Sequence, residues 1–234
     1  MSPYPSLPDL VAAVAPRPCA GCRGSGGPWC RACAATLTGP ASRADLRPVP
    51  EGLPPVLARA AYAGPLREAL VAFKDHGRWS LRAPLGASLA VPVAALLLGS
   101  GRPRAVLVPV AASPGSVRAR DGDHVRELAS VAAAALRACG ADVRVGAALT
   151  GVRRRRDQVG LGRADRAANL AGSMRAAGAS RRLVDVVLVD DLTTTGSTLA
   201  EAARALGSVG VEPLGAAVVA ATRTLDLQGP RRGA

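Results

Sequence analysis

Residues 190–198 combine two carboxylates with several hydroxyl side chains around a single glycine. Hydroxyl and backbone N–H groups donate hydrogen bonds to phosphate, and small residues let a phosphate approach the backbone closely. Carboxylates suit a ligand that also carries sugar hydroxyls or a magnesium ion. The stretch therefore predicts a site for an anion that carries both kinds of group. Its residues of interest are, in order, Asp190, Asp191, Thr193, Thr194, Thr195, Gly196, Ser197 and Thr198.

The segments on either side predict how this stretch is held. Residues 186–189 form a short, mainly β-branched apolar run, which is typical of a strand buried on both faces of a parallel sheet. We expect the acids to end this strand at Asp190, since only then can both adjacent carboxylates reach one ligand. Apolar residues recur at helical spacing from Leu199 to Leu206, and Gly207 closes the pattern. Such a loop presents backbone N–H groups at the positive end of a helix, where open α/β sheets bind ligands.

Residues 189–198 resemble the motif that binds 5-phosphoribosyl-1-pyrophosphate (PRPP) in type I phosphoribosyltransferases. The resemblance implies that residues 194–198 bind the 5′-phosphate. It also implies that Asp190 and Asp191 hold the ribose 2′ and 3′ hydroxyls, directly or through magnesium-bound water. The alternative is an ordinary strand-to-helix turn with a hydroxyl N-cap. Neither G-x-x-x-x-G-K-[ST] nor a G-x-G-x-x-G after a strand occurs in the chain.

Two C-x-x-C pairs lie close together near the N-terminus. Four thiolates at this spacing predict a zinc site, and a glycine-rich loop between the pairs allows the chain to fold back. The alternative is a redox or disulfide pair, which cytosolic conditions disfavour. Because four protein ligands leave no open position, we expect a structural ion rather than a catalytic one. The predicted ligands are Cys19, Cys22, Cys30 and Cys33.

The chain from about residue 10 to residue 222 resembles the ComF family, phosphoribosyltransferase-like proteins linked in some bacteria to natural competence. The resemblance implies an N-terminal zinc module followed by a phosphoribosyltransferase domain. Departures occur at residues 120–124, where the family often has Arg-Gly-Phe-Asn-Gln, and at Ala111, where it usually has proline. Besides the cysteines and the PRPP-like loop, the matching positions are Tyr62, Gly64, Lys74, Gly77, Val108, Pro109, Val110, Arg118, Arg120, Gln158, Leu161, Arg166 and Asn169.

Apolar strand patterns alternate with helical patterns along most of the chain, which predicts an α/β fold with an open parallel sheet flanked by helices. Residues 1–50 are assigned to a small four-cysteine module and a linker, residues 51–225 to the phosphoribosyltransferase-like domain, and residues 226–234 to a disordered tail. The expected strands are residues 56–62, 105–110, 143–149, 186–189 and, as the last one, 216–221. Expected helices cover about residues 66–73 and 81–98, and a third runs from an N-cap at Asp123 to about Ala138.

Arginine supplies almost all of the positive charge, and the net charge is +13. This charge indicates anionic ligands or partners, such as polyphosphates or nucleic acid, although a solvated surface is an alternative for most positions. Arg118 and Arg120 follow a predicted strand, and Arg154 and Arg155 lie in a basic run that is a candidate lid over polyphosphate. We expect these four arginines to bind pyrophosphate, because guanidinium groups match phosphate oxygens well.

The resemblance implies a cytoplasmic enzyme that binds PRPP, or another sugar phosphate, with Mg²⁺. It would transfer the phosphoribosyl group to an acceptor that no residue identifies, and release pyrophosphate. The alternative is a non-catalytic accessory protein that binds PRPP, DNA or a protein of the competence machinery. A shortage of aromatic residues argues against a dedicated single-strand binder. No signal peptide or membrane span is expected, and the sequence leaves the oligomeric state open.

Overall fold

A single mixed sheet organises the structure, a computed structural model that describes residues 17–111, 122–152, 172–177, 180 and 183–226. The strand order is β4-β3-β7-β8-β2-β1-β9. The first five of these strands are parallel to one another. At one edge β1 pairs antiparallel with β2, and β9 pairs antiparallel with β1. The parallel strands are β2 (Val56–Ala61), β3 (Arg104–Pro109), β4 (Asp142–Val145), β7 (Val186–Thr193) and β8 (Gly215–Ala221). The edge strands are β1 (Ser42–Ala44) and β9 (Thr224–Asp226).

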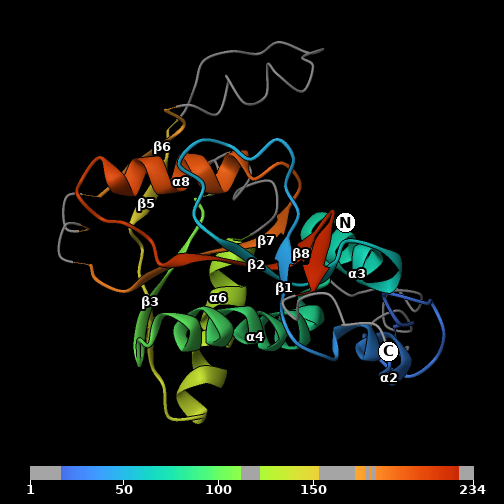
Figure 1. The fold of residues 1–234 in the computed structure, drawn as a ribbon. Coiled ribbons are helices and arrows are strands. Elements are labelled where there is room, and N and C mark those ends of the chain that lie inside the picture. Colours follow the sequence, from blue (N-terminus) through green and yellow to red (C-terminus); the bar gives the residue numbers. More distant parts are fainter. Residues whose placement is uncertain (1–16, 112–121, 153–171, 178–179, 181–182, 227–234) are drawn as a thin grey trace, which may run out of the picture.

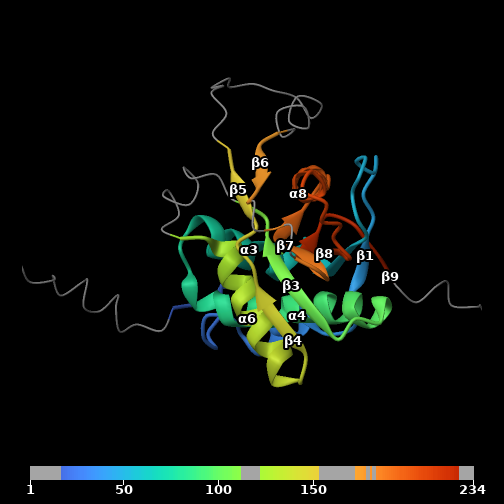
Figure 2. The same ribbon diagram turned by 90° about the vertical axis from the view of Figure 1, so that its left-hand side faces the viewer.

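Helices cover both faces of this sheet (Figures 1 and 2). Helices α4 (Arg82–Ser100) and α6 (His124–Ala138) lie below it in Figure 1, and α8 (Ser197–Gly207) lies above. Helix α3 (Gly64–Asp75) joins the same apolar cluster as α4 and α6. Side chains of β7 alternate between the two clusters, since Val187 and Val189 face α4 and α6 while Val186 and Leu188 face α8. Burial on both faces explains the continuous apolar run in this strand.

Several shorter elements complete the described chain. Helix α2 (Arg31–Ala34) and the 3-10 turn η1 (Ala35–Leu37) follow the second cysteine pair, and the 3-10 turn η2 (Trp79–Leu81) joins α3 to α4. Strands β5 (Leu149–Gly151) and β6 (Met174–Ala176) form a separate antiparallel pair. This pair stands on the α8 side of the main sheet (Figure 2).

The structure confirms the expected α/β fold and corrects several local expectations. The acidic pair does not end β7, which runs on to Thr193. Residues 216–221 do not form the last strand, because β9 follows and returns along the sheet edge. The range 143–149 includes most of β4 and the first residue of β5 rather than one strand. Strand β1 lies within residues 1–50, assigned above to the four-cysteine module and a linker, and the domain boundary at residue 50 stays a prediction.

One helical segment in the described residues, Trp79–Ser100, is long and apolar enough to cross a membrane by length and composition, with a mean hydropathy of 1.7. Within the structure, however, 44% of this window is buried. Leu85, Leu89 and Val93 are fully buried in the cluster that α4 forms with α6 and the sheet. These contacts are those of a core helix in a globular fold.

Candidate functional site

The loop after β7 presents the N-terminus of α8. Thr194 and Thr195 are exposed, while Ser197 and Thr198, the first residues of the helix, are half-buried. Across this fully described helix, no side chain caps the N-terminus and the first turn carries no acidic residue. The first backbone N–H groups of a helix lack partners within the helix and bear a partial positive charge. The end of α8 can therefore accept an anion such as a phosphate.

Gly196 lets the loop turn into the helix. Its φ of 79° lies in the left-handed region, which residues with a side chain rarely adopt. A β-carbon here would also lie 2.9 Å from both Leu46 Cδ1 and Leu53 Cδ2. These leucines belong to the segment between β1 and β2, so this segment packs directly against the loop after β7. A glycine is required here for both backbone conformation and space.

Hydrogen bonds fix the rest of the loop. The Thr195 and Ser197 hydroxyl oxygens lie 3.0 Å apart, and the Ser197 amide donates to Thr195 Oγ1 at 3.4 Å. Thr222, which directly follows β8, donates its amide to the carbonyl of Thr193 and its hydroxyl to the carbonyl of Thr194, each at 3.2 Å. Sequence reasoning missed Thr222, because its importance depends on the neighbouring strand. The loop is thus held by the carboxyl end of β8.

Asp190 and Asp191 lie within β7 and are both buried, with 8% and 2% of their surfaces exposed. The expected strand end at Asp190 is therefore wrong, and the binding of one ligand by both carboxylates stays a prediction. The sheet accommodates the acids by giving each a local partner. Asp190 Oδ1 accepts a hydrogen bond from the amide of Asp191 at 2.8 Å. The pairing between β7 and β8 includes Asp190 and Leu192 but not Asp191.

Lys74 is the partner of the second acid. Its Nζ lies 2.9 Å from Asp191 Oδ2 and 3.2 Å from Oδ1. The lysine side chain is 33% exposed and the Asp191 side chain 3% exposed, so the ion pair is largely withdrawn from water. Lys74 comes from the last turn of α3, 117 residues earlier in the chain. Sequence reasoning named it only through the family resemblance, although it is the single lysine among the 30 Lys and Arg residues.

The acidic pair does not carry two ordinary carboxylates. Burial and the neighbouring negative charge of Asp191 raise the pKa of Asp190 well above its usual value. The charge of Lys74 and the hydrogen bond from the Asp191 amide act in the opposite direction but do not outweigh them. Asp190 therefore takes up a proton more readily than an exposed carboxylate does, and it lies beside the ion pair of Asp191 with Lys74.

Glu201 ties α8 to the β5–β6 pair. Its buried carboxylate accepts a hydrogen bond from the Met174 amide at 3.0 Å and pairs with Arg204 at 2.6 and 2.9 Å. Burial alone would raise the pKa of Glu201, but the Arg204 and Met174 hydrogen bonds prevail and hold this pKa below its ordinary value. Helix α8 is thereby anchored through β6.

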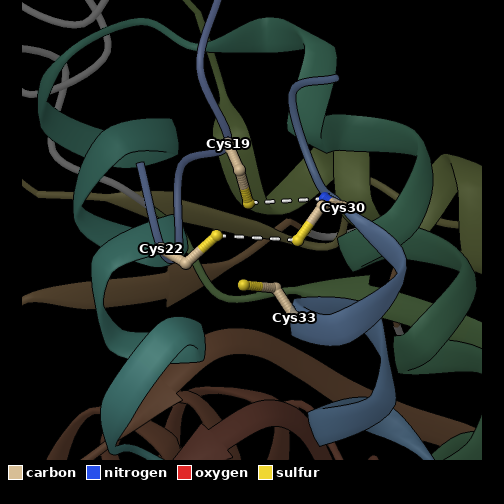
Figure 3. Close-up of side chains that lie close together, drawn as sticks. All are labelled: Cys19, Cys22, Cys30 and Cys33. Atoms are coloured by element: carbon tan, nitrogen blue, oxygen red, sulfur yellow. Dashed lines mark hydrogen bonds between the residues drawn. The ribbon is translucent and has the colours of Figure 1, made fainter. Parts of the chain in front are cut away.

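The four predicted cysteines come together (Figure 3). All four sulfur atoms lie within 4.8 Å of one another, and the sulfurs of Cys22 and Cys30 are 3.6 Å apart. A tetrahedral zinc ion with Zn–S distances of ~2.3 Å requires sulfur separations of about 3.8 Å, so the cluster fits this ion. The cluster consists of Cys19, Cys22, Cys30 and Cys33, on the two knuckles before and at the start of α2.

Backbone amides favour a thiolate in this cluster. Burial would raise the pKa of Cys19, but amides including that of Cys30, whose nitrogen lies 3.3 Å from the sulfur, lower this pKa to about 6. Burial and the surrounding thiols raise the pKa of Cys33. Without an ion, the four sulfurs cannot all carry a negative charge at such short distances. A divalent cation would remove this conflict.

The cysteine module packs against both ends of α3. A β-carbon at Gly21 would lie 2.8 Å from Pro65 Cβ, so the first knuckle touches the start of the helix. Beyond the end of the helix, Arg78 donates from its guanidinium group to the carbonyl of Pro18 at 2.7 Å. Ala20 is buried in the core cluster, and Trp29 packs against it. The module is therefore part of the surroundings of the helix that carries Lys74.

The predicted pyrophosphate ligands Arg118, Arg120, Arg154 and Arg155 lie outside the described residues, as does the rest of the basic run. The structure thus brings together the hydroxyl loop, the acidic pair and Lys74 in one place. It brings the four cysteines together in another. Asp123, predicted as an N-cap, accepts a hydrogen bond from the Arg126 amide at 3.1 Å, which confirms this assignment at the start of α6.

Comparison with known proteins adds one finding. Residues 127–228 match the family model of the phosphoribosyl transferase domain. No curated protein matches the chain significantly. The matched segment includes β7, the hydroxyl loop, α8 and β8, which are the elements that form the candidate anion site. This match, together with the parallel sheet and the loop at the carboxyl end of β7, supports the type I phosphoribosyltransferase fold.

Proposed function

We propose that the protein binds PRPP and transfers its phosphoribosyl group to an acceptor that is still to be identified, releasing pyrophosphate. The observation that carries this proposal is the acidic pair beside the uncapped N-terminus of α8. A sugar phosphate carries the two complementary groups, hydroxyls for the acids and a phosphate for the helix. The match to the phosphoribosyl transferase domain supports the same reaction class.

Each part of the site has a role in this reaction. The bond between the anomeric carbon and the pyrophosphate oxygen breaks, and the acceptor forms the new bond to that carbon. Backbone N–H groups and hydroxyls of residues 194–198 would bind the 5′-phosphate and fix the sugar. Asp190 and Asp191 would hold the ribose hydroxyls and stabilise positive charge on the ring. A magnesium ion carried by the pyrophosphate would neutralise charge on the leaving group.

We further propose that the four-cysteine cluster binds zinc as a structural ion, on the basis of its sulfur geometry. The cluster on the N-terminal side of a phosphoribosyl transferase domain also supports assignment to the ComF family and, with it, a cytoplasmic location. A role in competence is part of this assignment. It requires a separate genetic test, because the candidate site concerns the sugar phosphate alone.

Titration calorimetry with PRPP and Mg²⁺ tests ligand binding. Wild type is expected to bind, and replacement of Asp190 and Asp191 by alanine is expected to abolish most of the heat. Asp142→Ala, which removes an exposed carboxylate on β4, is the matched control and should bind like wild type. Absence of heat with wild type, or equal binding by the double variant, would contradict the assignment.

A screen of nucleobase acceptors for pyrophosphate release tests the transfer step. Release that depends on both PRPP and one acceptor supports a transferase. PRPP binding without release for any acceptor would instead favour the accessory role, in which the bound sugar phosphate acts as a signal.

A further inference from the structure

Building on the proposed function, we infer that Lys74 is a built-in counter-ion of the acidic pair and takes the place of a divalent cation there. The ribose-phosphate half of PRPP would therefore bind without Mg²⁺ at Asp190 and Asp191. Magnesium would be needed only for the pyrophosphate half. Lys74 is in this sense a positioning residue, because it acts on the ribose through the carboxylates.

The contacts of Asp191 carry the inference. Both of its carboxylate oxygens lie within 3.2 Å of Lys74 Nζ, so the ammonium group contacts both oxygens at once. The carboxylate of Asp190 is turned back to the amide of Asp191. A magnesium ion demands near-octahedral geometry with oxygens at ~2.0–2.1 Å and keeps several waters. Two side chains that are 8% and 2% exposed offer little room for such a hydrated ion.

The acidic pair already has a cation in contact. Lys74 supplies a positive charge at 2.9 Å from Asp191. Burial and the charge of Asp191 raise the pKa of Asp190, which lowers the demand for a second cation. A divalent cation added to this set would leave uncompensated positive charge in a buried place, which is strongly unfavourable.

The backbone that carries Lys74 is held in place by the core. Its neighbour Phe73 is fully buried and makes edge-on ring contacts with Trp79 at 5.6 Å and His124 at 4.9 Å. These two residues stack on each other with centroids 4.6 Å apart. The end of α3 is therefore fixed by aromatic packing. This packing holds the backbone of Lys74 in place, so that the ammonium group is positioned in advance for its contact with Asp191.

The residue type fits this role. Lys74 is the single lysine of the chain, and the remaining Lys and Arg positions are all arginine. A lysine ammonium is a compact point charge with three rotatable donors, whereas a guanidinium group is a flat fork. The ammonium group reaches both oxygens of Asp191 from one point, whereas a guanidinium group would have to approach the carboxylate with its flat fork. Lys74→Arg is therefore not a conservative change at this site.

Calorimetry with ribose 5-phosphate, which lacks pyrophosphate, isolates the predicted effect. Wild type should bind it with affinities that agree within about twofold in saturating Mg²⁺ and in EDTA. Lys74→Met should weaken binding in EDTA by about tenfold or more, since a buried carboxylate loses its charge partner. Added Mg²⁺ should restore part of this loss in the variant only.

Arg67→Met is the matched control, because it removes an exposed cation from the same helix, where Arg67 pairs with Glu68 at 3.6 Å. It should bind like wild type in both conditions. Strict Mg²⁺ dependence of ribose 5-phosphate binding by wild type would overturn the inference, even if Lys74→Met failed to fold. Binding by Lys74→Met equal to that of wild type would overturn it as well.

The same series separates this inference from the proposed function. If neither PRPP nor ribose 5-phosphate binds under any condition, both the proposed function and the role of Lys74 are wrong. If both ligands bind but ribose 5-phosphate requires Mg²⁺, only the role of Lys74 is wrong.

Discussion

The carboxylate of Glu201 accepts a hydrogen bond from the backbone amide of Met174 at 3.0 Å, which links α8 to a strand outside the main sheet. Arg204 lies one turn further along α8 and holds the same carboxylate while donating to the Met174 carbonyl at 3.3 Å. Helix α8 is thus positioned by a polar clamp at its middle as well as by apolar packing.

Glu201→Ala should lower the free energy of unfolding by about 2–3 kcal/mol, because it leaves the Met174 amide without an acceptor and removes the ion pair with Arg204. Glu201→Gln keeps an acceptor for the amide and should lose less. Urea unfolding at neutral pH measures both differences. A change below about 0.5 kcal/mol for Glu201→Ala would show that the clamp does not stabilise the fold.

The same clamp should depend on pH. Because the pKa of Glu201 is lowered in the folded state, its contribution is fully present above the unfolded pKa of about 4.3. This contribution to stability should disappear as the pH falls through the lower pKa that Glu201 has in the folded protein. The stability difference between wild type and Glu201→Gln should therefore shrink on acidification, and a difference that grows would contradict the assignment.

Gly196→Ala should destabilise the protein by about 1–3 kcal/mol, since a left-handed backbone and two leucine methyl groups oppose the new β-carbon. It should also weaken PRPP binding, because the loop that carries the donors must move. Gly207→Ala, at the other end of α8, meets nothing within 4 Å and should be neutral or slightly stabilising. Thermal unfolding and calorimetry of the pair test this expectation, and similar losses for both glycines would rule it out.

Metal analysis should find about one zinc ion per chain, bound by the four-cysteine cluster. Cys22→Ala should lose the metal, whereas Cys139→Ala, an exposed cysteine outside the cluster, should retain it. Chelation of wild type should lower the Tm by about 5 °C or more, because binding stabilises only the folded module. Full metal content in Cys22→Ala would exclude this ligand set.

Asp123→Ala should destabilise the protein by about 1 kcal/mol, because the side chain caps the first turn of α6 by accepting from the Arg126 amide. Asp123→Asn should retain most of the stability, since the amide oxygen can accept the same hydrogen bond. Chemical unfolding of the two variants provides the comparison. Equal losses would indicate that the charge rather than the cap matters here.

Local patterns were enough to predict the central strand, loop and helix from residues 186 to 207. Each part of that signal lies within a few residues, and an apolar run followed by a hydroxyl loop has few structural solutions. The spacing of the four cysteines predicted their cluster for the same reason. The Asp123 cap was predictable because capping depends on residues three positions apart.

Long-range contacts could not be predicted in this way. The two acids were expected to end β7, yet the strand continues, because Lys74 and the Asp191 amide satisfy them inside the sheet. No local signal shows that Lys74, from α3, supplies this charge. Strands β1 and β9 have three residues each, too few for a periodic pattern, and they exist because they pair along one edge.

The grip of the cysteine module on both ends of α3 has a consequence for the chain as a whole. A shortened chain that began after Leu37 would strip Pro65 of its neighbour and leave the Arg78 guanidinium without the Pro18 carbonyl. The helix would then keep its core packing around Phe73 but lose its contacts with the cysteine module at both ends. Oxidation of the sulfurs would disturb the same contacts and, through α3, the surroundings of Lys74.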